Sequence, residues 1–202
     1  MLPRLYPIVD AATFATSQDL YGFAKQLISG GATVIQYRNK KGSAREALSH
    51  ARQLRVLAPA DVRLVMNDRA DLCLAAGFDG VHLGQDDLSP DAARTIVQQR
   101  KWIGVSTHNL QQASEADSSL ADYIAIGPIF ATNSKQRPDP TVGLDGLKKI
   151  RAATRKPLVA IGGITLSNAR SVIDAGADSV AVISGLLASP AKTVEDFIRI
   201  LM

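Results

Sequence analysis

Short apolar runs alternate with longer segments of mixed polarity along the 202-residue chain. The runs are continuous stretches of Val, Ile and Leu, which are typical of parallel strands covered on both faces. They predict eight strands, at residues 4–9, 33–37, 64–66, 80–83, 102–105, 123–126, 158–161 and 179–183. We therefore expect a sheet that lies inside the protein.

Between these runs, apolar residues recur every three to four positions, which is the spacing of an amphipathic helix. Leu20, Phe23 and Leu27, for example, fall on one side of the first such segment. Serines stand where several of these helices begin, as expected of residues that cap free N–H groups: Ser17, Ser43, Ser89 and Ser167. The predicted helices cover residues 17–28, 43–57, 69–76, 90–100, 110–116, 144–153, 167–175 and 191–201.

Eight regular strand–helix units predict an α/β fold, a single closed (β/α)8 TIM barrel over residues 1–202. A Gly-Ala or Ala-Gly pair before a strand recurs at 31–32, 76–77 and 175–176, which supports a repeated unit. The alternative is an open, doubly wound sheet. We favour the barrel because an open sheet would rarely need eight evenly spaced units.

Carboxylates follow two successive predicted strands. Asp68 follows the third strand and Asp87 follows the fourth. The carboxyl ends of parallel strands lie on one face of a sheet, so these two side chains are expected to meet. Two carboxylates with substrate phosphates suit Mg²⁺. Helix capping is the alternative role for one such aspartate, but the pairing favours a metal.

Glycines follow the last two strands, in IGGI at 161–164 and ISG at 183–185. In TIM barrels, the loops after these two strands often bind a phosphate through backbone N–H groups. The alternative is that the glycines only permit tight turns. The chain has no G-x-G-x-x-G motif, so a dinucleotide is not favoured.

Three cations stand at or near strand ends: Arg38, Lys40 and Lys135. If they gather beside the two aspartates, they suit a diphosphate bound with Mg²⁺, because the metal bridges acid and phosphate while the cations neutralise the remaining charge. The alternative is an ordinary solvated basic loop. Together with the glycine loops, these cations would give one rim two anion sites, which suggests two phosphorylated substrates.

Composition narrows the other classes of function. The chain is 46% hydrophobic and 21% charged with net charge +4, as in an ordinary globular protein, and its ten aromatic residues do not alternate with basic ones, which disfavours nucleic acid. The single Cys73 is expected to be a buried structural thiol. His82 is expected to be an interior histidine with its hydrogen bonds satisfied, and His108 is expected to line the rim.

Without a secretory or membrane-spanning apolar segment, we expect a soluble cytoplasmic protein with no membrane partner. The oligomeric state is left open, with a homo-oligomer as one option.

Seven motifs together resemble the thiamine phosphate synthase family. They are QYRNK at 36–40, ND at 67–68, GQDD at 84–87, GVSTHN at 104–109, GPIFATNSK at 127–135, IGGIT at 161–165 and VISG at 182–185. The resemblance covers nearly the whole chain, and the motifs come in the family's order. It implies a Mg²⁺-assisted transfer in which a pyrimidine methyl diphosphate loses diphosphate and the thiazole phosphate nitrogen captures the pyrimidine cation. Thiamine phosphate is the product, with CO₂ also released when the thiazole carries a carboxylate.

The resemblance also implies a role for each matching residue. The pyrimidine diphosphate would be bound by Gln36, Tyr37, Arg38, Asn39, Lys40, Asn67, Ser106 and Lys135, of which Arg38, Ser106 and Lys135 would be catalytic. The thiazole phosphate would be bound by Thr132, Asn133, Ser134, Gly163, Ile183 and Ser184. Mg²⁺ would be held by Asp68 and Asp87. The family often has Thr where this chain has Ser134, and serine keeps the hydroxyl.

Three other functions would account for parts of this sequence. A thiazole tautomerase of the same fold would be expected to lack the metal acids and to carry a histidine where this chain has Pro128. A sugar-phosphate isomerase or epimerase would use the glycine loops but would leave the QYRNK and NSK cations unexplained. A non-catalytic sensor of thiamine phosphate would not need the two metal-binding aspartates.

The long loop at 127–142 is expected to close over the substrates and bring Lys135 to the diphosphate.

Overall fold

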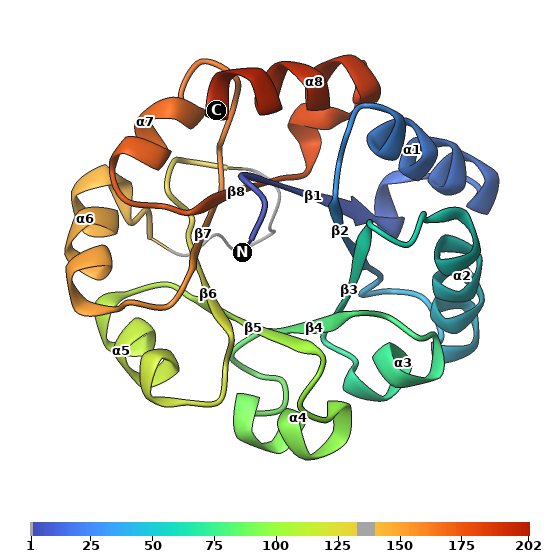
Figure 1. The fold of residues 1–202 in the computed structure, drawn as a ribbon, viewed down its shortest axis with the longest axis horizontal. Coiled ribbons are helices and arrows are strands. Elements are labelled where there is room, and N and C mark those ends of the chain that lie inside the picture. Colours follow the sequence, from blue (N-terminus) through green and yellow to red (C-terminus); the bar gives the residue numbers. More distant parts are fainter. Residues whose placement is uncertain (1, 133–139) are drawn as a thin grey trace.

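The computed structural model describes residues 2–132 and 140–202, and in this part of the chain eight strands close into a barrel inside a ring of eight helices (Figure 1). The strands are β1 (Leu5–Asp10), β2 (Val34–Arg38), β3 (Arg63–Asn67), β4 (Gly80–Leu83), β5 (Trp102–Thr107), β6 (Tyr123–Ile126), β7 (Leu158–Ile161) and β8 (Ser179–Val182). The helices are α1 (Ser17–Ser29), α2 (Ala44–Leu57), α3 (Ala70–Ala75), α4 (Pro90–Val97), α5 (Leu110–Ser118), α6 (Gly143–Ala153), α7 (Ala169–Asp174) and α8 (Pro190–Leu201). The predicted (β/α)8 barrel is confirmed.

All neighbouring strands are parallel, and β1 pairs with β8 to close the sheet, with Leu5 opposite Val180. Such a sheet has no edge strand. Helices cover its outer face and side chains fill its interior, so both faces of each strand are buried. This is why the apolar runs are continuous rather than alternating.

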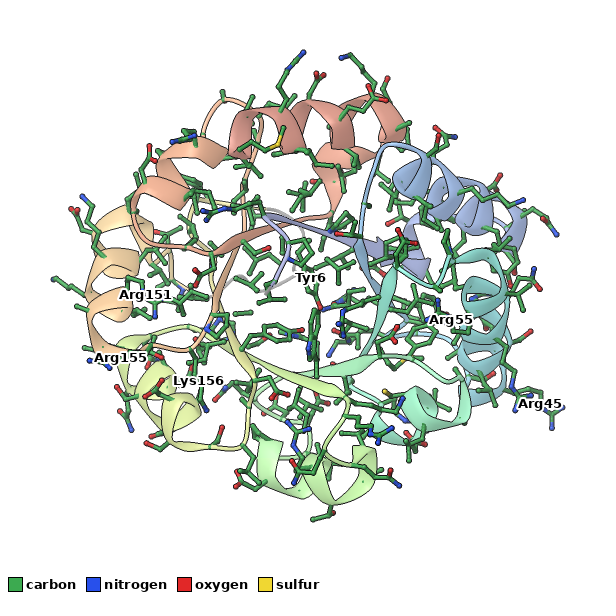
Figure 2. The ribbon with its side chains drawn as sticks, in the orientation of Figure 1. Tyr6, Arg45, Arg55, Arg151, Arg155 and Lys156 are labelled. Carbon is green, nitrogen blue, oxygen red and sulfur yellow. The ribbon has the colours of Figure 1, made fainter. Side chains whose placement is uncertain are left out.

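The apolar core has two layers. The larger layer lies between the strands and the helices and includes Leu20, Phe23 and Leu27 of α1, as the helical spacing predicts. The smaller layer fills the barrel interior and includes Tyr6, Ile8, Val34, Val65, Tyr123, Ala125, Val159 and Ala181. Tyr6 lies at the centre of the ring of strands in Figure 2. The interior is therefore packed, and the open space lies above this layer.

Two predicted helix caps are wrong. Thr16, rather than Ser17, accepts the N–H of Asp19, so the Ser17 hydroxyl is free to bond elsewhere. Ser167 does not cap α7; its hydroxyl bonds to Thr165. Spacing alone could not distinguish adjacent hydroxyl residues, because the choice depends on where the chain leaves its extended conformation.

Among the element boundaries that differ from those expected, two have a clear local cause. α4 ends at Val97 rather than near residue 100, because Gln98 takes a left-handed backbone with φ 65°. β5 continues to Thr107, whose hydroxyl donates to the Ala125 carbonyl on β6. The bond to a neighbouring strand extends β5 through polar residues that the apolar pattern could not assign.

An arginine–aspartate pair recurs three times at the amino-terminal ends of the strands. In each, an arginine from an even-numbered helix pairs with the aspartate just before the second strand that follows: Arg55–Asp79 at 2.9 Å, Arg94–Asp122 at 2.6 Å and Arg151–Asp178 at 3.0 Å. Each aspartate also accepts a backbone N–H from the strand between them, at Leu64, Ile103 and Leu158. Arg55 and Arg151 lie on different sides of the ring in Figure 2. The three pairs tie helices to the barrel on the face opposite the strand ends that carry the site.

Cys73 is buried in α3, with its Sγ 3.2 Å from the Gly80 carbonyl oxygen, as expected of a structural thiol. Burial raises the pKa of this thiol to about 11, so it stays protonated at neutral pH. Of the helices in the described residues, none is long and apolar enough to cross a membrane.

Candidate active site

A cavity of about 530 Å³ opens at the carboxyl ends of the strands, and residues from or just after all eight strands line it. The predicted site residues that line it are Gln36, Arg38, Lys40, Asn67, Asp68, Asp87, Ser106, Thr132, Gly163, Ile183 and Ser184. Asn133, Ser134 and Lys135 lie outside the described residues, so their predicted roles, and the closing of the 127–142 loop, stay predictions. Residues far apart in the sequence thus meet in one place.

The two predicted metal acids come together on one side of the cavity. Asp68 follows β3 with a left-handed backbone, φ 64°, and its N–H donates to the His82 carbonyl at 2.7 Å. Asp87 folds back so that its Oδ2 accepts the Gly84 N–H at 2.7 Å. Burial raises the pKa of Asp68, the adjacent Asp87 carboxyl raises it further, and Lys40 opposes both. Burial is the largest of these effects on the pKa of Asp68.

Lys40 supplies one cation to the pair, with its Nζ 2.8 Å from Asp68 Oδ2. Within the described residues, no group of three or more His, Cys, Asp or Glu side chains gathers as a metal site. Asp68 and Asp87 therefore provide two hard oxygen donors and leave the rest of a coordination shell to other ligands. That donor set fits Mg²⁺, which commonly takes one or two carboxylates together with substrate phosphates and water.

Arg38, the last residue of β2, lines the same cavity as these two carboxylates. It forms an ion pair with Asp10, the last residue of β1 and its neighbour in the sheet. Asp10 does not line the cavity and was not predicted as a site residue. The ion pair with Asp10 holds the guanidinium from the neighbouring strand, which restricts the rotamers of the long Arg38 side chain.

A connected set of polar side chains forms the floor of the cavity. The hydroxyls of Tyr6 and Tyr123 lie 2.8 Å apart, and Gln36 Nε2 donates to Tyr6 at 3.3 Å. Tyr123 bonds to His82 Nδ1 at 3.0 Å, and His82 Nε2 bonds to the Ser106 hydroxyl at 2.9 Å. The expected interior bonding of His82 is confirmed, and the structure adds that this histidine faces the cavity.

The floor is uncharged at neutral pH. Burial lowers the pKa of His82 to about 4 and raises the pKa of Tyr6 to about 12. Burial also raises the pKa of Tyr123 well above its ordinary value. The cavity therefore combines a charged rim with a neutral, hydrogen-bonding floor.

Sequence reasoning missed Tyr6 and Tyr123 as site residues because it considered only the strand ends. The one signal available was Gly104 in β5. A Cβ at Gly104 would lie 2.0 Å from Cζ of Tyr123, so the missing side chain leaves room for this ring. His108, expected to line the rim, does line the cavity, and its Nδ1 lies 2.6 Å from the Gly127 carbonyl oxygen.

The glycine loops after β7 and β8 form the opposite side of the cavity. Gly162 and Gly163 have φ values of 100° and 64°, which other residues rarely adopt. A Cβ at Gly163 would also lie 2.7 Å from the Ala131 carbonyl oxygen, so the backbone of the 130–131 segment packs directly on this turn. Ile183 and Ser184 follow β8, and Ser184 begins a single 3-10 turn, η2 (Ser184–Leu186).

Tyr37 and Asn39, predicted to contact the pyrimidine diphosphate, do not line the cavity. Successive residues of a strand point to opposite faces, so Gln36 and Arg38 face the cavity while Tyr37 points outward and is fully buried under the helices. Asn39 turns back behind the rim, where its Nδ2 donates to the Tyr37 hydroxyl at 3.2 Å. A contiguous sequence motif thus divides between the cavity and the layer behind it.

Comparison with known proteins gives a consistent family. The model of a family described as thiamine monophosphate synthase matches residues 5–186. The thiamine-phosphate synthase of Koribacter versatilis is 60% identical over 203 aligned positions, covering 99% of this chain and 96% of that protein. The corresponding protein of Chloroflexus aurantiacus is 45% identical over 187 positions, covering 92% of this chain and 86% of that one.

Comparison with solved structures gives the same family. Thiamine phosphate pyrophosphorylase from Pyrococcus furiosus superposes with a TM-score of 0.85 at 33% identity, covering 98% of this chain and 95% of that chain. A 3-hexulose-6-phosphate synthase superposes with a TM-score of 0.77 at 18% identity, covering 98% of this chain and 100% of that chain, which shows a shared fold alone. The family model and both sequence relatives cover nearly all of the barrel described above. The chain therefore belongs to the thiamine monophosphate synthase family.

Proposed function

We propose that this protein joins 4-amino-2-methyl-5-(diphosphooxymethyl)pyrimidine to a thiazole phosphate, giving thiamine phosphate and diphosphate. The bond between the pyrimidine methylene carbon and the diphosphate oxygen breaks with its electron pair on oxygen. The thiazole nitrogen then supplies the pair for the new carbon–nitrogen bond. A carboxythiazole phosphate would also lose CO₂. Family membership supports the transferase activity.

One observation carries this proposal: the cavity places two cations and two carboxylates directly beside an uncharged, hydrogen-bonding floor. A diphosphate ester of a neutral aromatic ring has the same division between a charged end and a polar but uncharged end. We place the ring on the floor, within reach of Gln36 and Ser106, and the diphosphate at the rim beside Arg38 and Lys40.

Mg²⁺ would be held by Asp68 and Asp87, and when bound it would supply positive charge to the leaving diphosphate. Arg38 and Lys40 add charge from the β2 side, and Arg38 is already oriented by Asp10. Asn67 Nδ2 is buried and has no hydrogen-bond partner among the residues that the structure describes, although Asn67 lines the cavity. An unpaired buried donor costs free energy, so a substrate oxygen at this point would remove that cost on binding.

The second substrate would bind across the mouth, with its phosphate at Gly163, Ile183 and Ser184. Backbone N–H groups in glycine turns are well suited to phosphate oxygens. Thr132 lines the same cavity and, with Asn133 and Ser134, would complete this locus.

The structure raises one alternative mechanism, because Ser106 and His82 are hydrogen-bonded like a nucleophile and its base. The other nitrogen of His82 faces a tyrosine hydroxyl rather than a carboxylate. With a pKa of about 4, His82 is a weak base, and an imidazolium there would lie in a buried, neutral floor. The pair therefore favours positioning of the ring over covalent catalysis, in keeping with a dissociative displacement.

Incubation of the protein with the pyrimidine diphosphate and the thiazole phosphate, with and without Mg²⁺, tests the proposal. Thiamine phosphate is measured by chromatography and diphosphate by a coupled assay. We expect equal amounts of both, with Mg²⁺ required. Binding of thiamine phosphate without turnover would instead indicate a sensor. Interconversion of thiazole forms without coupling would indicate a tautomerase.

A further inference from the structure

A chain of hydrogen bonds runs behind the rim from the 39–42 turn to the start of α1. Asn39 Nδ2 lies 3.2 Å from the Tyr37 hydroxyl, which lies 2.9 Å from His50 Nδ1. His50 Nε2 lies 2.8 Å from the hydroxyl of Ser17. His50 and Tyr37 are buried, and none of the four residues lines the cavity.

One assignment of donors and acceptors satisfies every hydrogen bond in this series. The Asn39 amide can only donate to the Tyr37 oxygen. The Tyr37 hydrogen is then available for His50 Nδ1, which leaves the imidazole hydrogen on Nε2 to donate to Ser17. Bonds at both ring nitrogens hold the imidazole of His50 in one orientation.

At its other end, the Asn39 side chain closes the turn that carries Lys40. Asn39 Oδ1 accepts the Gly42 N–H at 2.7 Å, and Lys40 lies inside the turn so formed. A Cβ at Gly42 would lie 2.4 Å from Asn39 Nδ2, so the amide packs directly against this glycine. Lys40 extends from the turn to Asp68.

We propose that Ser17, His50, Tyr37 and Asn39 are positioning residues, which hold the 39–42 turn so that Lys40 points at the diphosphate. This inference rests on the proposed function, and it assigns Tyr37 and Asn39 a role that does not require contact with substrate. The buried Tyr37 hydroxyl supports it, because a phenylalanine would fill the same space without the cost of burying a polar group.

The test measures binding of inorganic diphosphate by calorimetry at a fixed Mg²⁺ concentration. Tyr37→Phe removes the central hydroxyl, and Gly42→Ala pushes the Asn39 amide aside from the opposite end. Both should weaken diphosphate about five- to tenfold, which is the effect of losing about one hydrogen bond. Affinity for thiazole phosphate should not change, because its locus is on the far side of the mouth.

Tyr21→Phe is the matched control. Tyr21 also packs edge-on against the His50 ring, with centroids 5.8 Å apart, so the variant makes the same chemical change beside the same histidine. It should bind diphosphate like the unchanged protein. Equal weakening by Tyr21→Phe would show a general packing effect and overturn the inference.

Histidine variants separate positioning from packing. The Asn side chain can place its amide near the Nδ1 position, so His50→Asn should retain the bond to Tyr37 and bind diphosphate within about twofold of normal. His50→Leu removes both ring hydrogen bonds, so it should weaken diphosphate binding as Tyr37→Phe does. If Tyr37→Phe and Gly42→Ala bind diphosphate normally, the inference is wrong while the proposed function stands. If the unchanged protein neither binds diphosphate nor turns over, both fail.

Discussion

Asp68 combines three unusual features in one residue: a left-handed backbone, partial burial, and an ion pair beside a second carboxyl group. A left-handed backbone costs free energy for a residue with a Cβ. Such strain at a strand end is consistent with a side chain held for function rather than for packing. The raised pKa of Asp68 has burial as its main cause, and a bound cation would offset that cost.

We expect Asp68→Asn and Asp87→Asn each to reduce turnover at least about tenfold and to raise the Mg²⁺ concentration needed for half-maximal rate. The change keeps the shape but removes an anionic ligand. Asp86→Asn is the control, because Asp86 lies at the same rim and is expected to have a smaller effect. Rates titrated against Mg²⁺ decide this, and an unchanged Mg²⁺ requirement in both variants would refute the metal assignment.

His82 predicts a specific loss of stability in acid. Its pKa is about 4 in the folded protein against 6.5 for an ordinary histidine, so the unfolded chain takes up the proton first as the pH falls. The free energy of unfolding should therefore decrease between pH 6.5 and 4, by on the order of 3 kcal/mol from this group, and should be independent of it above about pH 7.

Urea unfolding between pH 4.5 and 7.5 measures this effect. His82→Gln cannot titrate but can still bond to Ser106, so its stability should fall less steeply toward acid than that of the unchanged protein. Parallel curves for the two proteins would mean that His82 has the same pKa in the folded and the unfolded chain.

Among the helices, α2, α4 and α6 are each tied to the barrel by the arginine of an arginine–aspartate pair. Arg94 is the most buried of these arginines, with 8% of its side chain exposed. Besides Asp122, it donates to three carbonyl groups, those of Gln98, Lys101 and Leu120. One side chain thus satisfies the end of α4 and the start of both β5 and β6.

We expect Arg94→Met to lower the free energy of unfolding by about 3 kcal/mol, because three carbonyl groups lose their donor while Asp122 keeps only the Ile103 N–H. Arg170→Met is the control: Arg170 pairs with Asp174 on the surface of α7, with both side chains more than half exposed, and should cost less than about 1 kcal/mol. Denaturant unfolding of the two variants compares these values. Similar small losses in both would show that the pair at Arg94 adds little.

In the whole molecule, the two proposed phosphate loci lie on opposite sides of one mouth, one after β2 to β4 and the other after β7 and β8. Closing the barrel is what brings both sides around one cavity. Two separate loci should respond independently to substitution.

Lys40→Ala should weaken inorganic diphosphate about ten- to a hundredfold, and Ser184→Ala should weaken thiazole phosphate about three- to tenfold, each with little effect on the other ligand. Gly163 is a poorer probe, because any side chain there meets the Ala131 carbonyl oxygen and would move the turn itself. Calorimetry on the folded variants measures both affinities. Equal loss of both ligands in either variant would contradict separate loci.

The sequence by itself determined the order of strands and helices and the chemistry at the strand ends. A barrel strand must be apolar on both faces, so its run of Val, Ile and Leu is visible without a structure. Strand ends must leave the core, so Asp68, Asp87 and Lys40 stand out as polar residues at predictable places. Because parallel strands end on one face, the proximity of the two aspartates could be predicted from the sequence.

Tertiary structure alone decided which way individual side chains face. Tyr6 and Tyr37 both lie inside apolar runs, yet Tyr6 forms the cavity floor and Tyr37 lies outside the barrel, bonded to His50. The runs are apolar on both faces, so polarity carries no information about which residues point inward. That direction is set by strand register and by the closure of β1 on β8. The floor and the support behind the rim therefore depend on contacts between strands, which no local pattern encodes.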